Sequence, residues 1–242
     1  MHKFLYLLLL STWACTPSSS ETESQATADA QPEQVQEIDS TLIRFEAEVL
    51  KFEQSDKVKR PVKGVCLFTG SSSVRLWRDL EGDVKPLPVI NRGFGGSTFR
   101  ELNHYFDRLV VPYRPKLVVV YEGDNDLVDG QTSPEEILAQ LDLFRRQADD
   151  KIPYAKLFML AIKPSPSRRV LLDKVEETNA LFRAYCDTSE RVTYLDIFSP
   201  MMLPDGRIDG SLFGGDSLHM NDKGYQVWAD VIVEPLLEAY AK

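Results

Sequence analysis

The sequence predicts one α/β/α domain, in which a mostly parallel sheet of about five strands lies between two layers of helices. Three observations support this fold class. Short apolar runs of strand length recur along the chain, helical patterns alternate with them, and the runs are apolar throughout, as in strands buried on both faces. The 242 residues, 43% hydrophobic and 27% charged, suit a globular protein with one sizeable core.

The expected elements follow one another from about residue 39 onward. A first helix is predicted at about 39–55, because its apolar side chains recur on one face. Strands are predicted at 65–68, 87–90, 116–121, 156–162 and 192–197. Further helices are predicted near 98–110, 134–147, 168–187 and 222–240. Pro235 is expected to kink or restart the last of these helices.

The N-terminal residues are predicted to lie outside the folded domain, which we place at 38–242. Residues 1–15 hold one lysine and a leucine-rich run before Cys15, too short to span a bilayer and typical of a secretory signal. The segment resembles a bacterial lipoprotein signal, which would lipidate Cys15; an ordinary signal peptide with a chance cysteine is the alternative. Residues 16–37 hold one valine as their only large apolar side chain and predict a disordered tether. We therefore expect an exported, membrane-anchored protein in the periplasm or at the cell surface.

The net charge bears on the partners of the chain, and the cysteines bear on whether it forms a disulfide. The formal net charge is −9 and the chain has no basic block, which argues against a nucleic-acid partner, because phosphates require a positive surface. Cys66 and Cys186 are expected to be buried free thiols rather than a disulfide, since nothing in their spacing brings them together.

Residue types used in catalysis occur in the loops that follow the predicted strands. In a parallel sheet, ligand sites lie at the carboxyl ends of the strands. The five loops there contain TGSSSV, NRGFGGST, YEGDND, KPSPSRR and GGDSLHMND. Loops are generally rich in glycine, serine and aspartate, so no single loop identifies a site.

Histidine is the scarcest of the catalytic residue types in this chain. His104 lies inside a helical pattern and is interpreted as a surface or helix-packing residue. His219 follows Asp216 by three residues, and on a helical turn these two positions share one face. Asp216 would then orient His219 through Nδ1, leaving Nε2 to accept a proton. The alternative is that Asp216 is only a loop cap and His219 only the start of a helix.

Taken together, the loops offer the parts needed for acyl transfer. The first has serine hydroxyls, the second glycine amides, the third the side chain of Asn125, and the last an oriented base. A nucleophile, a base, an acid that orients the base and donors for an oxyanion are the groups this chemistry uses.

This arrangement resembles the SGNH hydrolases, also called GDSL-type esterases. Their four blocks correspond in order to Gly70-Ser71-Ser72, Gly96, Gly123-Asp124-Asn125-Asp126 and Asp216-Ser217-Leu218-His219. The resemblance implies a flavodoxin-like sheet and a hydrolase without a cofactor.

The resemblance also implies roles for individual residues. Ser72 would be the nucleophile, and its own amide, that of Gly96 and the side chain of Asn125 would form the oxyanion hole. Ser71 replaces the usual aspartate of the first block. Ser71 and Ser73 therefore remain weaker candidates for the nucleophile.

Other functional classes fit less well. An α/β-hydrolase elbow needs a glycine two residues after the serine, where Val74 stands. A calcium loop starting at Asp124 lacks an oxygen ligand at its fifth position and a glycine at its sixth. A metal-dependent phosphodiesterase is disfavoured, because only one usable histidine lies near the acids, so no metal is expected. A non-catalytic binding module on the same fold remains the main alternative.

The substrate is less sharply defined than the chemistry. The chain has no long insertion that would form a lid, which favours an open site for small acyl esters, such as acetyl on a carbohydrate. Lysophospholipids and thioesters remain alternatives. Trp77 is either a sugar-stacking face or a core residue. Arg168 and Arg169 either meet an anionic substrate group or form a solvated helix start.

Overall fold

The computed structural model describes residues 42–242, apart from the side chain of Asp129. The predicted signal at 1–15, its lipidation site Cys15 and the tether at 16–37 lie outside the described residues. The described part belongs to one compact unit, Ile38–Lys242. Within residues 42–242, no helix has both the length and the apolar character that a membrane span requires.

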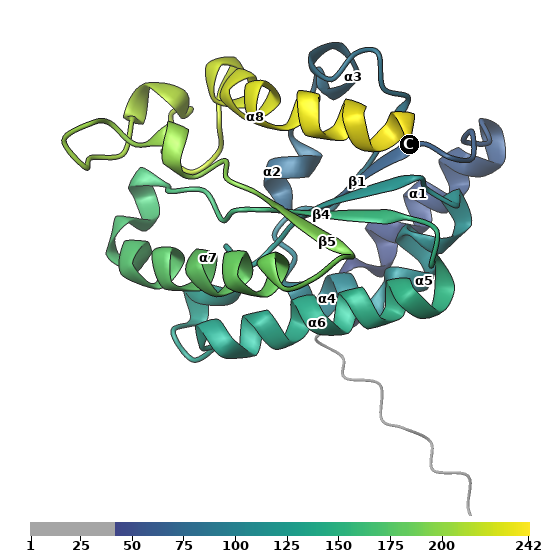
Figure 1. Ribbon diagram of the computed structural model, residues 1–242, viewed down its shortest axis with the longest axis horizontal. Coiled ribbons are helices and arrows are strands. Elements are labelled where there is room, and N and C mark those ends of the chain that lie inside the picture. Colours follow the sequence, from purple (N-terminus) through teal and green to yellow (C-terminus); the bar gives the residue numbers. More distant parts are fainter. Residues whose placement is uncertain (1–41) are drawn as a thin grey trace, which may run out of the picture. The chain divides into compact units, whose positions relative to one another are not determined.

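A five-stranded parallel sheet forms the middle layer of this unit (Figure 1). Its strands are β1 (Cys66–Gly70), β2 (Val89–Gly93), β3 (Leu117–Tyr121), β4 (Lys156–Leu160) and β5 (Val192–Leu195). Their order is β2-β1-β3-β4-β5, and each neighbouring pair is parallel. This is the flavodoxin-like order. The predicted fold class is confirmed.

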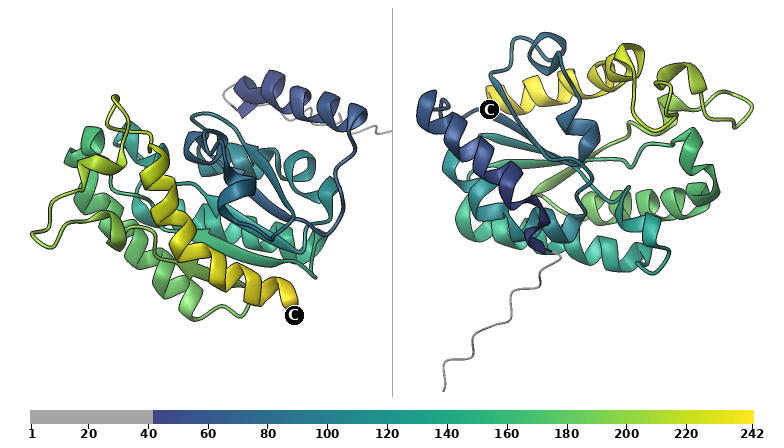
Figure 2. Two further views of the ribbon diagram at one scale, coloured as in Figure 1. Left: turned by 90° about the horizontal axis from the view of Figure 1, so that it is seen from above. Right: turned by 180° about the vertical axis from the view of Figure 1, so that it is seen from behind.

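Helices cover both faces of the sheet (Figures 1 and 2). One face is covered by α1 (Glu46–Val58), α4 (Phe99–His104), α5 (Phe106–Leu109), α6 (Pro134–Lys151) and α7 (Leu172–Asp187). The other is covered by α2 (Ser72–Arg75), α3 (Leu80–Asp83) and α8 (Asp222–Ala241). Successive strand residues point to opposite faces, so Leu67 joins the first core while Cys66 and Phe68 join the second.

Short 3₁₀ segments connect several of these elements. They are η1 (Leu42–Phe45), η2 (Val111–Tyr113), η3 (Asp126–Asp129), η4 (Pro166–Leu171), η5 (Ser199–Met201) and η6 (Gly210–Leu212). Three of them are the next element after a strand, η3 after β3, η4 after β4 and η5 after β5. The loops with η3 and η4 build the site described below.

The helices depart from the predicted pattern in several places, beginning with the first, which is α-helical only from Glu46 to Val58, after η1. The helix expected at 98–110 is broken at Tyr105 into α4 and α5. The helix expected from 168 begins at Leu172, after η4. Helices α2 and α3 are four residues each, too short to show a period in the sequence. Finally, α8 runs as one helix from Asp222 to Ala241 with Pro235 inside it, so the helix does not restart at Pro235.

The two cysteines lie in different layers of the core. Cys66 and Cys186 are free and buried, as predicted. Cys66 belongs to the core under α8, and Cys186 to the core under α6 and α7. Burial raises the pKa of both thiols, that of Cys186 to about 12. Both are therefore neutral thiols in the folded chain.

Candidate active site

A tight turn after β1 presents one serine of the Ser71–Ser73 triplet. Gly70 has φ 127°, and a Cβ there would lie 2.0 Å from the carbonyl oxygen of Tyr121. Only glycine fits this close approach. The Ser71 amide then donates to the same oxygen at 3.1 Å. Ser71 and Ser73 are 1% and 2% exposed, whereas Ser72 is partly exposed, so the turn presents Ser72.

The structure brings Ser72, His219 and Asp216 together. His219 Nε2 lies 2.9 Å from Ser72 Oγ, and His219 Nδ1 lies 2.6 Å from Asp216 Oδ2. The three groups form one continuous row of hydrogen bonds. Ser72 is the first residue of α2, just after β1, and the other two come from the loop that precedes α8.

The contact between Asp216 and His219 has a different cause from the one predicted. Residues 216–219 form a loop rather than a helical turn, so the predicted helical geometry is wrong although the pairing is present. Asp216 Oδ1 accepts hydrogen bonds from the amides of Leu218, at 3.0 Å, and His219, at 2.9 Å. The backbone of the loop therefore curves around the Asp216 side chain. Hydrogen bonds from the His219 ring and from these two amides lower the pKa of Asp216. Asp216 is therefore an anion.

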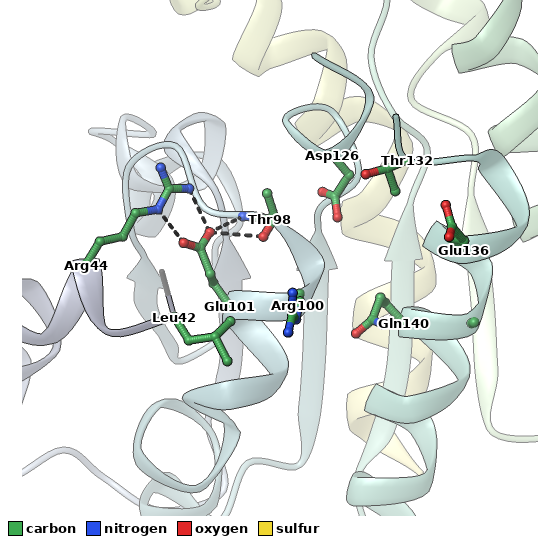
Figure 3. Close-up of a pocket in the computed structure, with 10 residues that line it drawn as sticks. Leu42, Arg44, Thr98, Arg100, Glu101, Asp126, Thr132, Glu136 and Gln140 are labelled. Carbon is green, nitrogen blue, oxygen red and sulfur yellow. Dashed lines mark hydrogen bonds and ion pairs between the residues drawn. The ribbon is translucent and has the colours of Figure 1, made fainter. Parts of the chain in front are cut away.

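Gly96 lies in a loop whose backbone is bound by Arg44, which also forms a salt bridge with Glu101. Gly96 has φ 82°, and its backbone oxygen accepts a hydrogen bond from Arg44 at 3.0 Å. Arg44 is also paired with Glu101, which accepts from the Thr98 amide at 2.8 Å and closes a capping box at the start of α4. Figure 3 shows Glu101 between Arg44 and Thr98. These three residues line part of a cavity of about 720 Å³. Arg44, Glu101 and Thr98 thus support the backbone that carries Gly96.

Asn125 fastens the loop after β3 to the loop after β2. Its Nδ2 donates to the Ser97 carbonyl at 2.8 Å. The neighbouring Asp126 carboxylate accepts from the Phe99 amide at 3.1 Å. The sheet register places these loops beside the turn at Ser72, since Gly70 pairs with Gly93 and Tyr121. All the residues predicted for the site therefore lie at one edge of the sheet.

A buried charge cluster, which the sequence did not indicate, lies behind Asn125. Asp124 is 5% exposed, and its Oδ2 lies 2.7 Å from Lys163 Nζ. Its Oδ1 lies 2.5 Å from Arg168 Nη1, and Arg168 Nη2 donates to Asn125 Oδ1 at 2.9 Å. Burial alone would raise the pKa of Asp124, but the charges of Lys163 and Arg168 outweigh it and hold that pKa low.

This cluster gives Arg168 a place in the site. Its guanidinium is bound to Asp124 and Asn125 and its side chain is 19% exposed, so it is not the freely solvated helix start that was the alternative. Arg169 is exposed, in keeping with a solvated position. Lys163 directly follows the predicted strand at 156–162, and a lysine at that position does not by itself indicate a buried ion pair.

Glu122 is a fully buried carboxyl group beside the same loops. It shares a hydrogen bond of 2.5 Å with Ser97 Oγ, and its Oε2 has no partner among the described residues. Burial, and next the charge of Asp126, raise the pKa of Glu122 well above its ordinary value. Glu122 therefore keeps its proton to a higher pH than an exposed glutamate does.

Trp77 lies in the core and His104 on the surface of a helix. Trp77 is 2% exposed and packs against Phe68, Tyr225 and Trp228. Its core interpretation is confirmed, and it has no face free for a sugar. His104 is exposed at the C-terminal end of α4. Among residues 42–242, no group of three or more His, Cys, Asp and Glu side chains is arranged to hold a metal ion.

Solved structures with the same fold come from several bacteria. A protein from Bacteroides fragilis assigned as an acylhydrolase has a TM-score of 0.69 at 21% identity, over 80% of this chain and 98% of that one. A GDSL-like lipase from Bacteroides thetaiotaomicron has a TM-score of 0.64 at 21% identity, over 82% and 98%. An acetyl xylan esterase from Geobacillus stearothermophilus has a TM-score of 0.58 at 15% identity, over 72% and 95%. At these identities the likeness concerns the fold.

The family itself is shown by a sequence match. No curated protein matches the chain. The model of the GDSL-like Lipase/Acylhydrolase family, however, matches residues 64–227, which include the four loops with the predicted blocks and more than half of the chain. The chain belongs to the GDSL-like lipase/acylhydrolase family and is a carboxylic ester hydrolase.

Proposed function

We propose that the protein is a serine esterase that hydrolyses small acyl esters, including acetyl esters of carbohydrates. The observation that carries the proposal is the row of hydrogen bonds from Asp216 through His219 to Ser72 Oγ, of 2.6 and 2.9 Å. A hydroxyl bound to an imidazole, which is in turn oriented by a carboxylate, is the arrangement that activates serine.

The proposed reaction has two halves. His219 Nε2 takes the proton of Ser72 Oγ as that oxygen attacks the ester carbonyl carbon. The amides of Ser72 and Gly96 and the Asn125 side chain donate to the resulting oxyanion. The tetrahedral intermediate then breaks its bond to the alcohol oxygen, which takes the proton from His219. Water, activated by the same nitrogen, releases the acid and restores Ser72.

The surroundings of His219 support a polar alcohol part in the substrate. A cavity of about 540 Å³ lies beside His219 and Asp216. Its other lining residues include Arg78, Asp79, Asp222 and Gln226, whose side chains offer both hydrogen-bond donors and acceptors. Because His219 protonates the leaving alcohol, the alcohol part would lie on this side. Such a lining suits the hydroxyl groups of a carbohydrate better than a fatty chain.

A serine-directed phosphonate tests the nucleophile. We expect one adduct, on Ser72, and loss of at least about 10⁴-fold in kcat for Ser72→Ala and for His219→Ala. Their double variant should be little worse than either, because the two groups act as a unit. Ser71→Ala and Ser73→Ala are the matched controls and should keep most activity. An adduct on Ser71 or Ser73, or an active Ser72→Ala protein, contradicts the assignment.

A substrate panel tests the ester class. The mature domain should be assayed with p-nitrophenyl esters of increasing acyl length and with acetylated xylan or other acetylated sugars. We expect activity to be highest for acetyl esters and to fall as the chain lengthens. A preference for long-chain lysophospholipids or for thioesters would instead support those alternatives, and no cleavage of any ester would support a binding module.

We also propose that the protein is exported and lipid-anchored through Cys15, which the leucine-rich segment and the polar tether support. Metabolic labelling with a fatty acid should mark the wild type and not Cys15→Ala. Equal labelling of the two proteins rules the anchor out.

A further inference from the structure

The side-chain amide of Asn125 has two chemically different ends, and each has its own partner. Oδ1 accepts a hydrogen bond from Arg168 Nη2 at 2.9 Å, and Nδ2 donates to the Ser97 carbonyl at 2.8 Å. In the opposite orientation, the NH₂ group would face the donor Arg168, and Oδ1 would face a carbonyl. Two repulsive contacts would replace two hydrogen bonds, so the neighbours determine which way the amide points.

Arg168 is itself held at several points. Nη1 donates to Asp124 Oδ1 at 2.5 Å and to the Asp124 carbonyl at 2.9 Å. A guanidinium is planar and rigid, so fixing Nη1 also fixes Nη2, the atom that contacts Asn125. On its other side, Asp124 is paired with Lys163, which is 1% exposed and also donates to Ser165 Oγ at 3.0 Å.

From these contacts we infer that Arg168 is a positioning residue for the oxyanion hole and acts through Asn125. The inference rests on the proposed function, in which Asn125 donates to the oxyanion. One Nδ2 hydrogen is bound by Ser97, and the second is the one assigned to the substrate. Donation from a cation to Oδ1 polarises the amide and strengthens its N–H donors. A donor already oriented before the reaction needs no reorganisation as the oxyanion forms.

Arg168 can be removed without leaving Asp124 unpaired. Asp124 keeps its ion pair with Lys163 in Arg168→Ala, so we expect the variant to fold. Arg168→Lys retains a positive charge near Asp124 but cannot contact Asp124 and Asn125 with one rigid fork. It serves as the second variant if Arg168→Ala does not fold. Arg169→Ala, at the exposed neighbouring position, is the matched control.

A double-mutant cycle tests the route through Asn125. Arg168→Ala should lower kcat by about tenfold or more, with KM within about threefold, which is part of the loss expected for a missing oxyanion donor. In the Asn125→Ala background, Arg168→Ala should lower kcat by less than about threefold, because the side chain that Arg168 positions is gone. Added guanidinium ion, below denaturing concentrations, should partly restore kcat in Arg168→Ala and leave Arg169→Ala unaffected. An equal loss in both backgrounds, or a loss confined to KM, overturns the inference.

A measurement without substrate separates this inference from the proposed function. The Asn125 side-chain NH₂ resonances can be identified by NMR as those missing in Asn125→Ala. We expect them to shift and to exchange faster with water in Arg168→Ala and Arg168→Lys, and to stay unchanged in Arg169→Ala. Unchanged resonances in the Arg168 variants overturn the inference. If the wild type cleaves no ester, the proposed function fails, while these resonances still decide whether Arg168 orients Asn125.

Discussion

The two halves of the site hold their carboxylates in opposite environments. On one side, the Asp216 and His219 side chains are 52% and 28% exposed. On the other, those of Asp124 and Lys163 are 7% and 1% exposed. The pKa of each aspartate is lowered, for Asp216 by hydrogen bonds in a surface loop and for Asp124 by ion pairs that outweigh burial.

This difference matches what each half does in the proposed mechanism. Protons must enter and leave through His219, and partial exposure of that side chain permits exchange with water. The half around Asn125 moves no proton and acts by fixed charges and dipoles, which are stronger where water is excluded. The exposed half, around His219, would therefore exchange protons with water in each turnover, and the buried half, around Asp124, would keep Asn125 in a fixed position.

The largest expected effect is on stability, from Asp124→Asn. The change leaves Lys163 and Arg168 without their counter-charge in a buried position, which should lower the free energy of unfolding by about 3–5 kcal/mol. Asp216→Asn is the matched control in the exposed half of the site and should change the free energy of unfolding by less than about 0.5 kcal/mol. Urea unfolding of both variants measures the contrast. Equal losses would mean that the two halves do not differ in this way.

Asn125→Ala should reduce catalysis rather than stability. We expect kcat to fall by about 10²–10³-fold with little change in KM, as for the loss of one oxyanion donor. Asn103→Ala is a control from outside the site, since its side chain binds Gln140 on α6. Steady-state kinetics with an acetyl ester decide the point. A kcat within about threefold of the wild type would remove Asn125 from the mechanism.

The effect of Glu122 depends on pH. Its pKa is raised in the folded chain by burial and then by the charge of Asp126, with smaller contributions from Glu101 and Asp124, while the hydrogen bond from Ser97 opposes the shift. The folded chain thus keeps a proton that the unfolded chain releases, so its contribution to stability is greatest below the unfolded pKa and is lost as pH rises through the folded pKa.

Glu122→Gln removes this titration and keeps the shape of the side chain. Relative to the wild type, the variant should gain stability as pH rises from about 5 to 8, by at most about 1.4 kcal/mol per pH unit. Chemical unfolding at several pH values provides the measurement. A constant difference between the two proteins across this range would show that Glu122 does not titrate in this way.

The sequence predicted the sheet well because buried parallel strands are apolar along their whole length. Each predicted run overlaps the observed strand, as 116–121 does with Leu117–Tyr121. The contact between Asp216 and His219 was predicted for the wrong reason, because residue spacing does not distinguish a helical turn from a loop folded by its own carboxylate. In both geometries the two side chains meet.

The buried cluster could not be predicted in the same way. Arg168 follows Pro164 and Pro166 in a loop of serines and prolines, and nothing local to that stretch indicates that it reaches Asp124 on the neighbouring strand end. The contact depends on the order of β3 and β4 in the sheet. An ion pair between loops more than 40 residues apart is a property of the assembled sheet.

The buried thiols of Cys66 and Cys186 can be used to measure local unfolding of the two core layers. Cys66 lies in one core layer and Cys186 in the other, and neither reacts with a maleimide while it is buried and neutral. In the domain 38–242, which lacks Cys15, with one of these two cysteines replaced by serine at a time, the alkylation rate of the remaining thiol follows the opening of its own layer. Equal rates would mean that the two layers open as one cooperative unit, and unequal rates would identify the layer that separates from the sheet first.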